Sequence, residues 1–180
     1  MRILDEYGLP DLTMRRLAAA LEVQPSALYW HFPNKQSLLA ELSDRIVAEV
    51  DSGSADPEWA ARVRAEAFAL RAALLAHRDG AELVASTFAL GLGSRAAQHR
   101  LAAAIAAGGF DDESVQRATA VLLHFVLGHV LHEQQRQQYR DLGVQVDGID
   151  EPRQDEASDA EFVFGVELLV GGLQLRRGHG

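Results

Sequence analysis

The chain has 180 residues, no cysteine and a formal net charge of −9. Its 48% of hydrophobic residues suffices for a packed core, so a globular fold is expected. The lack of cysteine excludes disulfides and thiolate metal sites, and the acidic balance argues against a protein that coats nucleic acid without sequence preference. We find no signal segment and no apolar run of about 20 residues, so we expect a cytoplasmic protein that does not span or bind a membrane.

A short helix is expected over residues 2–7, and a helix-turn-helix pattern follows it. Thr13 is a suitable N-cap for the first of the two helices, and Pro25 fits the first turn of the second. Residues 22–24 form the turn, with Val23 as its expected apolar plug. The second helix is too short to have a core of its own, which indicates a helix presented to a partner such as the DNA major groove.

The remaining chain shows helical patterns almost throughout, so the predicted fold class is all-α. The polar stretch 52–56 divides the chain into a DNA-binding domain over 1–50, including a connecting helix, and a second domain over 51–180. Residues 140–159 are rich in glycine, proline and acidic side chains and are expected to form a flexible acidic loop. The helices expected after the helix-turn-helix cover residues 35–50, 57–77, 81–88, 95–107, 112–139 and 160–176.

Helices 112–139 and 160–176 are apolar on nearly every side. Such helices must be covered on nearly every side, which in a protein of this size predicts a homodimer joined through these two helices. Gly165, Gly171 and Gly172 would allow helices to approach closely. The alternative, in which both helices are simply the core of a monomer, stays open.

The segment Ala27-Leu28-Tyr29-Trp30-His31-Phe32-Pro33-Asn34-Lys35 resembles the end of the recognition helix and the start of the next helix in the tetracycline-repressor (TetR) family. Further on, His77-Arg78-Asp79-Gly80, the segment from His124-Phe125 to Leu131, and residues 162–168 resemble parts of the ligand-binding domain of the tetracycline-repressor branch. The resemblance implies a three-helix DNA-binding domain followed by a larger helical ligand-binding and dimerisation domain. In the family the first helix is longer on its N-terminal side, and we expect the present chain to lack part of it.

The resemblance also implies which residues contact double-stranded operator DNA. Family members use the recognition helix and its flanks, and a dimer is expected to bind a palindrome with half-sites about 34–36 Å apart. Arg15 is the candidate for bidentate contact with a guanine, whereas Leu28 and Phe32 are expected in the core. The expected base contacts are Arg15, Pro25, Ser26, Ala27, Tyr29 and Trp30, with Thr13, His31 and Lys35 near phosphates.

A small-molecule effector is implied as well. Tetracycline-binding family members hold the drug as a magnesium chelate through a His, an Asn, a Gln and a water-bridged acidic residue. Those positions fall here on Val84, Glu66, Leu101 and His132, and none keeps that chemistry. We therefore expect no magnesium–tetracycline, no metal and no cofactor, but a mostly apolar effector. The expected pocket residues are Glu66, Leu70, Val84, Thr87, Phe88, Leu101, His124, Phe125, Leu131 and His132.

No motif of an enzyme is found: the chain has no glycine-rich phosphate loop, no Gly-x-Ser-x-Gly and no His-Glu-x-x-His. His129 and His132 form an incomplete metal site. We expect a repressor in which the effector shifts helix 81–88 and, through it, the connecting helix 35–50. A DNA-binding protein without effector response stays open. A small-molecule-binding or interaction protein without operator binding also stays open. The charge of residues 1–50 favours it, since they hold seven acidic and only five basic residues.

Overall fold

The computed structural model describes residues 1–49, 54, 56–93, 95–143 and 151–178. These residues form nine α-helices and no strand, which confirms the predicted all-α class. The helices are α1 (Arg2–Tyr7), α2 (Met14–Ala20), α3 (Pro25–His31), α4 (Lys35–Ala48), α5 (Trp59–Leu75), α6 (Gly80–Ala89), α7 (Arg95–Ala106), α8 (Asp112–Asp141) and α9 (Glu151–Arg177).

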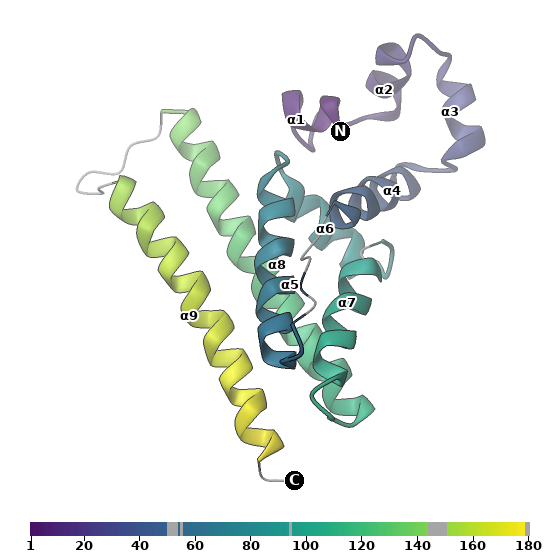
Figure 1. Cartoon of the computed structure of the whole chain (residues 1–180). Helices are drawn as coiled ribbons and strands as arrows, with labels where there is room; N and C mark the ends of the chain where they lie inside the picture. The colour runs from purple at the N-terminus through teal and green to yellow at the C-terminus, as the bar shows by residue number, and fades with distance from the viewer. Residues whose placement is uncertain (50–53, 55, 94, 144–150, 179–180) are drawn as a thin grey trace.

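Two parts can be followed in Figure 1: a small head formed by α1, α2 and α3, and a larger body formed by α5 to α9. Helix α4 runs from the head into the body, where it packs on α5, α6 and α7. Helix α5 packs on α7, α8 and α9. Its buried residues Val63, Ala67, Leu70 and Leu74 recur at helical spacing, so one face of α5 supplies the centre of the core.

The last helix begins at Glu151 rather than at residue 160, so the predicted acidic loop is wrong over 151–159. Pro152 occupies the first turn of the helix, where a missing N–H is harmless. Asp155 and Glu156 follow in the second turn, and acidic residues are compatible with a helix there. Residues that suggest a loop by composition thus suit a helix start equally well. The rest of the predicted loop, residues 144–150, lies outside the described residues.

One helix among the described residues, α8, is long and apolar enough to cross a bilayer by length and composition alone. The expectation that the chain has no apolar run of about 20 residues is therefore wrong for α8. Helix α8 packs on α5, α6, α7 and α9, and core helices of soluble proteins meet the same two criteria. The apolar character of α8 is therefore accounted for by its place in the body.

Helix α9 has one buried face and one exposed apolar face. Phe162, Val166 and Val170 recur every four residues and are fully buried against the body. Gly165 allows a close approach within the chain, because an added Cβ would lie 2.2 Å from the Phe125 ring, whereas Gly171 and Gly172 face open space. On the other side the large apolar side chains remain exposed within the single chain, namely Val163, Phe164, Leu168 and Leu175.

Candidate DNA-binding head and effector pocket

The helix-turn-helix forms as the sequence predicts. The Thr13 hydroxyl oxygen accepts a hydrogen bond from the Arg16 amide at 3.1 Å, which caps α2. The turn passes through Glu22, whose φ of 55° is left-handed, and the Val23 amide then donates to the Ala18 carbonyl at 3.0 Å. The side chain of Val23 is 42% exposed, so its predicted role as an apolar plug is wrong. Its backbone folds back onto α2 while its side chain faces outward.

Helix α3 is almost entirely exposed. Leu28 is its one buried residue, at 6% exposure, and the other six residues of the helix are exposed. Trp30 is 89% exposed and Tyr29 51%, which is far more than large aromatic side chains usually leave to water. The candidates Pro25, Ser26, Ala27 and His31 share this surface.

The two neighbouring arginines of α2 differ in their partners. Arg16 forms an ion pair with Asp11 at 3.2 Å and covers the Tyr7 ring at 4.6 Å. Arg15 is exposed and has no ion pair among the described residues. Lys35 is half-buried at the start of α4, which Asn34 caps by accepting from the Ser37 amide at 2.8 Å. Arg15 therefore remains available as a cation beside α3.

Four of the predicted pocket residues are buried in the core of the body. Leu70 of α5, Val84 and Thr87 of α6, and Leu101 of α7 are each at most 2% exposed. The Thr87 hydroxyl lies 3.1 Å from the Leu83 carbonyl oxygen and 3.0 Å from that of Val84, so α6 itself satisfies this polar group. The surface that these four residues present to a guest molecule is accordingly apolar.

The other predicted residues on α6 and α8 lie farther out. Phe88 is half-buried and meets the exposed His124 ring edge to face at 5.7 Å. Phe125 stacks on Phe162 of α9 at 5.6 Å, and so faces α9. Leu131 is half-buried and His132 is exposed.

Glu66, the remaining pocket candidate, has a cationic partner that no local sequence pattern signals. Its carboxylate accepts a hydrogen bond from Arg100 Nε at 3.0 Å, and both side chains are largely buried. Arg100 Nη2 also donates to the backbone carbonyl of Val47 at 2.9 Å. Arg100 of α7 therefore joins Glu66 of α5 to the body end of α4.

The segment from His77 to Gly80 connects the body to the head. Asp79 accepts a hydrogen bond from the Leu9 amide at 2.7 Å and is held from the other side by Gln138 of α8. His77 lies 3.0 Å from an oxygen of Asp5 and 3.1 Å from one of Glu49. A motif that resemblance assigns to the ligand-binding domain thus contacts α1, the loop after it and the end of α4.

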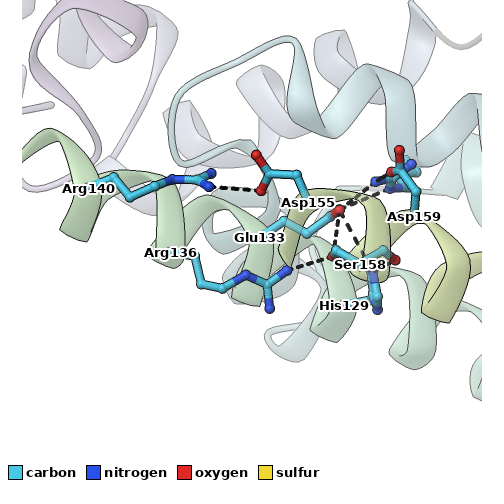
Figure 2. Close-up of polar contacts among 8 residues, drawn as sticks. His129, Glu133, Arg136, Arg140, Asp155, Ser158 and Asp159 are labelled. Atoms are coloured by element: carbon cyan, nitrogen blue, oxygen red, sulfur yellow. Dashed lines mark hydrogen bonds and ion pairs between the residues drawn. The ribbon is translucent and has the colours of Figure 1, made fainter. Parts of the chain in front are cut away.

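A polar cluster links α8 to α9 beside Arg71 of α5 (Figure 2). Arg71 donates to Glu133 at 2.5 Å and also pairs with Asp159. Burial raises the pKa of Glu133, but hydrogen bonds from Arg71 and Ser158 outweigh it and hold that pKa below its ordinary value. The same carboxylates hold the pKa of Arg71 above its ordinary value despite burial.

His129, Ser158 and Glu133 combine the residue types of a hydrolase triad, but their geometry does not activate the serine. His129 Nε2 lies 3.1 Å from the Ser158 carbonyl oxygen and 3.3 Å from the Ser158 hydroxyl. The carbonyl oxygen can only accept, so that contact is a hydrogen bond in the tautomer with the proton on Nε2, which cannot take a proton from the serine. The Ser158 hydroxyl donates to Glu133 at 3.0 Å. The cluster is therefore a structural link between helices. Over the described part of the chain, no group of three potential metal ligands was found.

Two family profiles match the sequence: residues 1–42 match "Bacterial regulatory proteins, tetR family", and residues 53–151 match "Tetracyclin repressor-like, C-terminal domain". The tetracycline repressor protein class A from transposon 1721 of Escherichia coli is 34% identical over 97% of this chain and 87% of that protein.

The crystal structure of Mycobacterium smegmatis BioQ is similar with a TM-score of 0.84 and 41% identity, over 99% of this chain and 93% of BioQ. BioQ with its natural double-stranded DNA operator is similar with a TM-score of 0.79 and 40% identity, over 96% and 91% of the two chains. Matches over both head and body agree with the geometry of α2, α3 and the helical body. The chain therefore belongs to the TetR family and is a ligand-responsive, DNA-binding transcriptional regulator.

Proposed function

We propose that the protein is a repressor that binds a palindromic operator as a homodimer and leaves it when a small, mostly apolar effector enters the body. The exposure of α3 carries this proposal. A helix that buries Leu28 alone contributes little to the core and offers its remaining surface to a DNA groove. The similarity to BioQ, solved with its operator, supports the same use of the head here.

Within the head, the proposed contacts follow exposure and charge. Arg15 reads a guanine, because it is exposed and no carboxylate of the described chain holds it. Tyr29, Trp30 and residues 25–27 supply the apolar part of the base contact. Thr13, His31 and Lys35, at the edges of α2, α3 and α4, contact phosphates.

The homodimer forms through α8 and α9. Phe164 and Leu168 are 64% and 59% exposed on the side of α9 that faces away from the body. Beside them, α8 and α9 form a groove of about 330 Å³, whose walls include Val121, Gly172 and Leu173. Apolar side chains of a second subunit would cover this surface, which single soluble chains rarely leave open.

The effector pocket is proposed between α5, α6 and α7. Leu70, Val84 and Leu101 make its inner wall apolar, and a valine at position 84 cannot ligate a cation. Glu66 and Arg100 supply a polar edge, which suits a mostly apolar molecule with one or two hydrogen-bonding groups.

Two contacts can transmit effector binding to the head. Helix α6 packs directly on α4, and Arg100 joins Glu66 to the Val47 carbonyl of α4. An effector that displaces α6 or the Arg100 side chain would change how α4 sits on the body. Because coupling is reciprocal, operator binding would weaken effector binding by the same factor. We assign the protein no catalytic activity and place it in the cytoplasm, where operator DNA is found.

The decisive experiment is selection of operators from random DNA by the purified protein, at low and at moderate salt. A palindrome with two equivalent half-sites about one helical turn apart, or slightly more, is expected. The test variant is Arg15→Gln, which should weaken operator binding. The control is Arg45→Gln on the exposed side of α4, which should bind the operator like the parent. If a folded dimer selects no common sequence, the operator proposal is overturned, and a small-molecule-binding protein that does not bind operator DNA is favoured.

A further inference from the structure

A cavity lies where the head meets the body, apart from the residues of the proposed effector site. Its volume is about 540 Å³. Its walls come from the end of α5, the last turns of α8, the first turns of α9 and Asp5 of α1. Among the described residues that line it, Leu75 alone is apolar. A guest of this cavity would therefore be hydrophilic, in contrast to the proposed effector.

Three of the carboxylates in the wall are already engaged by arginines (Figure 2). Glu133 and Asp159 both pair with Arg71. Asp155 pairs with Arg140 at 2.8 Å. These ion pairs compensate the negative charge of the three carboxylates within the protein itself.

Two guanidinium groups of the wall have no carboxylate partner among the described residues. Arg136 donates to the Ser158 hydroxyl at 2.6 Å, and Arg78 reaches only the Glu6 carbonyl oxygen, at 3.5 Å. The Nε atoms of Arg136 and Arg140 are buried without an acceptor, so a guest could meet these side chains only through their terminal Nη atoms. Arginine presents planar donors that match the oxygens of carboxylates and phosphates. Arg78 and Arg136 are thus the arginines of the wall that can still take an oxyanion as a partner.

We propose that this cavity is a ligand site, which binds a small hydrophilic molecule with carboxylate or phosphate groups through the arginines of its wall that lack a carboxylate partner, Arg136 and Arg78. The Asp141 carboxylate, which accepts only from Gln137 among the described residues, can receive a hydroxyl or amino group of the same molecule. The site would serve as a second input, chemically distinct from the apolar effector.

Its position explains how the head would respond. Asp5 of α1 lines the cavity and meets His77 at 3.0 Å, and Arg78 reaches the last turns of α1. An anion on Arg78 contacts both parts of the protein at once. The bound anion would favour one arrangement of head and body and so change operator affinity. Because coupling is reciprocal, the operator would change the affinity for the anion by the same factor.

The test uses the full chain and two probes, inorganic phosphate and citrate, titrated calorimetrically at constant ionic strength against chloride. We expect saturable binding of at least one probe, and the better probe identifies the oxyanion. Arg136→Gln and Arg78→Gln should each weaken it about tenfold, the loss of one charged hydrogen-bonding group. Arg117→Gln, an exposed arginine near the opposite end of α8 that pairs with Glu113, is the matched control and should bind like the parent.

Saturable binding that Arg78→Gln and Arg136→Gln weaken while Arg117→Gln does not would establish the site. Circular dichroism checks that each variant is folded. If Arg136→Gln unfolds, Arg78→Gln still tests the site, because Arg78 is an exposed side chain whose replacement should not affect folding. No saturable binding of either probe, or equal binding by all three variants, would overturn the proposal. Binding is measured without DNA, so this result is independent of whether the operator proposal holds.

Discussion

The contact at Gly165 gives a sharp prediction about how α8 and α9 are held together. A Cβ added there would lie 2.2 Å from Cζ and 2.5 Å from Cε2 of Phe125. The ring has little room to withdraw, because it stacks on the fully buried Phe162 at 5.6 Å and meets His129 at 5.8 Å. Gly165→Ala should therefore displace either the ring or the helix.

The expected magnitude combines two opposing effects. Alanine in place of glycine inside a helix stabilises by up to about 1 kcal/mol. Overpacking of a tight core contact costs about 1–3 kcal/mol. With a contact as short as 2.2 Å the upper part of that cost, about 2–3 kcal/mol, applies. Less the helix gain, Gly165→Ala should thus lower the free energy of unfolding by about 1–2 kcal/mol. Gly128→Ala, in α8 with no atom within 4 Å of the added Cβ, should instead raise it by up to about 1 kcal/mol.

Urea unfolding followed by circular dichroism measures both variants, at two protein concentrations because unfolding of a dimer depends on concentration. The double variant Gly165→Ala with Phe125→Ala removes the clashing ring. It should lose less stability than the sum of the two single variants. The reasoning is refuted if Gly165→Ala is as stable as the parent, or if the losses of the two single changes simply add.

Three further predictions concern the dimer, the operator and pH. Phe164→Glu should convert the dimer to monomers in analytical ultracentrifugation, whereas Gln174→Glu, also exposed on α9, should leave it dimeric; a dimeric Phe164→Glu would contradict the proposed interface. Arg15→Gln should cost about 1–3 kcal/mol of discrimination at one operator base pair, measured by fluorescence anisotropy on substituted operators, and a uniform loss over all sequences would assign Arg15 to phosphate instead. The pKa of Glu133 is held below its ordinary 4.5, so its contribution to stability is present above that pH and lost as pH falls through the lower, folded value. Urea unfolding should therefore show an advantage of the parent over Glu133→Gln that is constant from pH 7 to about 5 and shrinks below 4.5, and a constant difference down to acid pH would be inconsistent with the lowered pKa.

Local rules explain what the sequence could predict. Thr13 and Pro25 act on the backbone within a few residues of themselves, and the structure has both helix starts as predicted. The spacing of apolar residues likewise predicts long helices where the structure has α5 and α8. Composition misled at 151–159, because proline and acidic residues occur both in loops and in first turns of helices.

The long-range polar contacts could not be predicted in the same way. Arg100 meets Glu66 across 34 positions, and Asp79 meets the Leu9 amide across 70. Such pairs depend on how helices cross, and no spacing in the chain encodes that crossing. Resemblance to the family located Glu66 and Asp79, but not their partners.

Helix α4 is shared by the two parts of the protein. Leu38 and Leu42 line a groove of the head together with Leu17, whereas Ile46 and Val47 are fully buried in the body. A rigid helix of 14 residues is about 20 Å long and behaves as a lever with its pivot in the body. A tilt of only about 5° at that pivot moves its far end by about 2 Å. In a dimer, a small rotation of α4 beside Arg100 in each subunit would change the distance between the two α3 helices, and thereby the half-site spacing to which the dimer can bind.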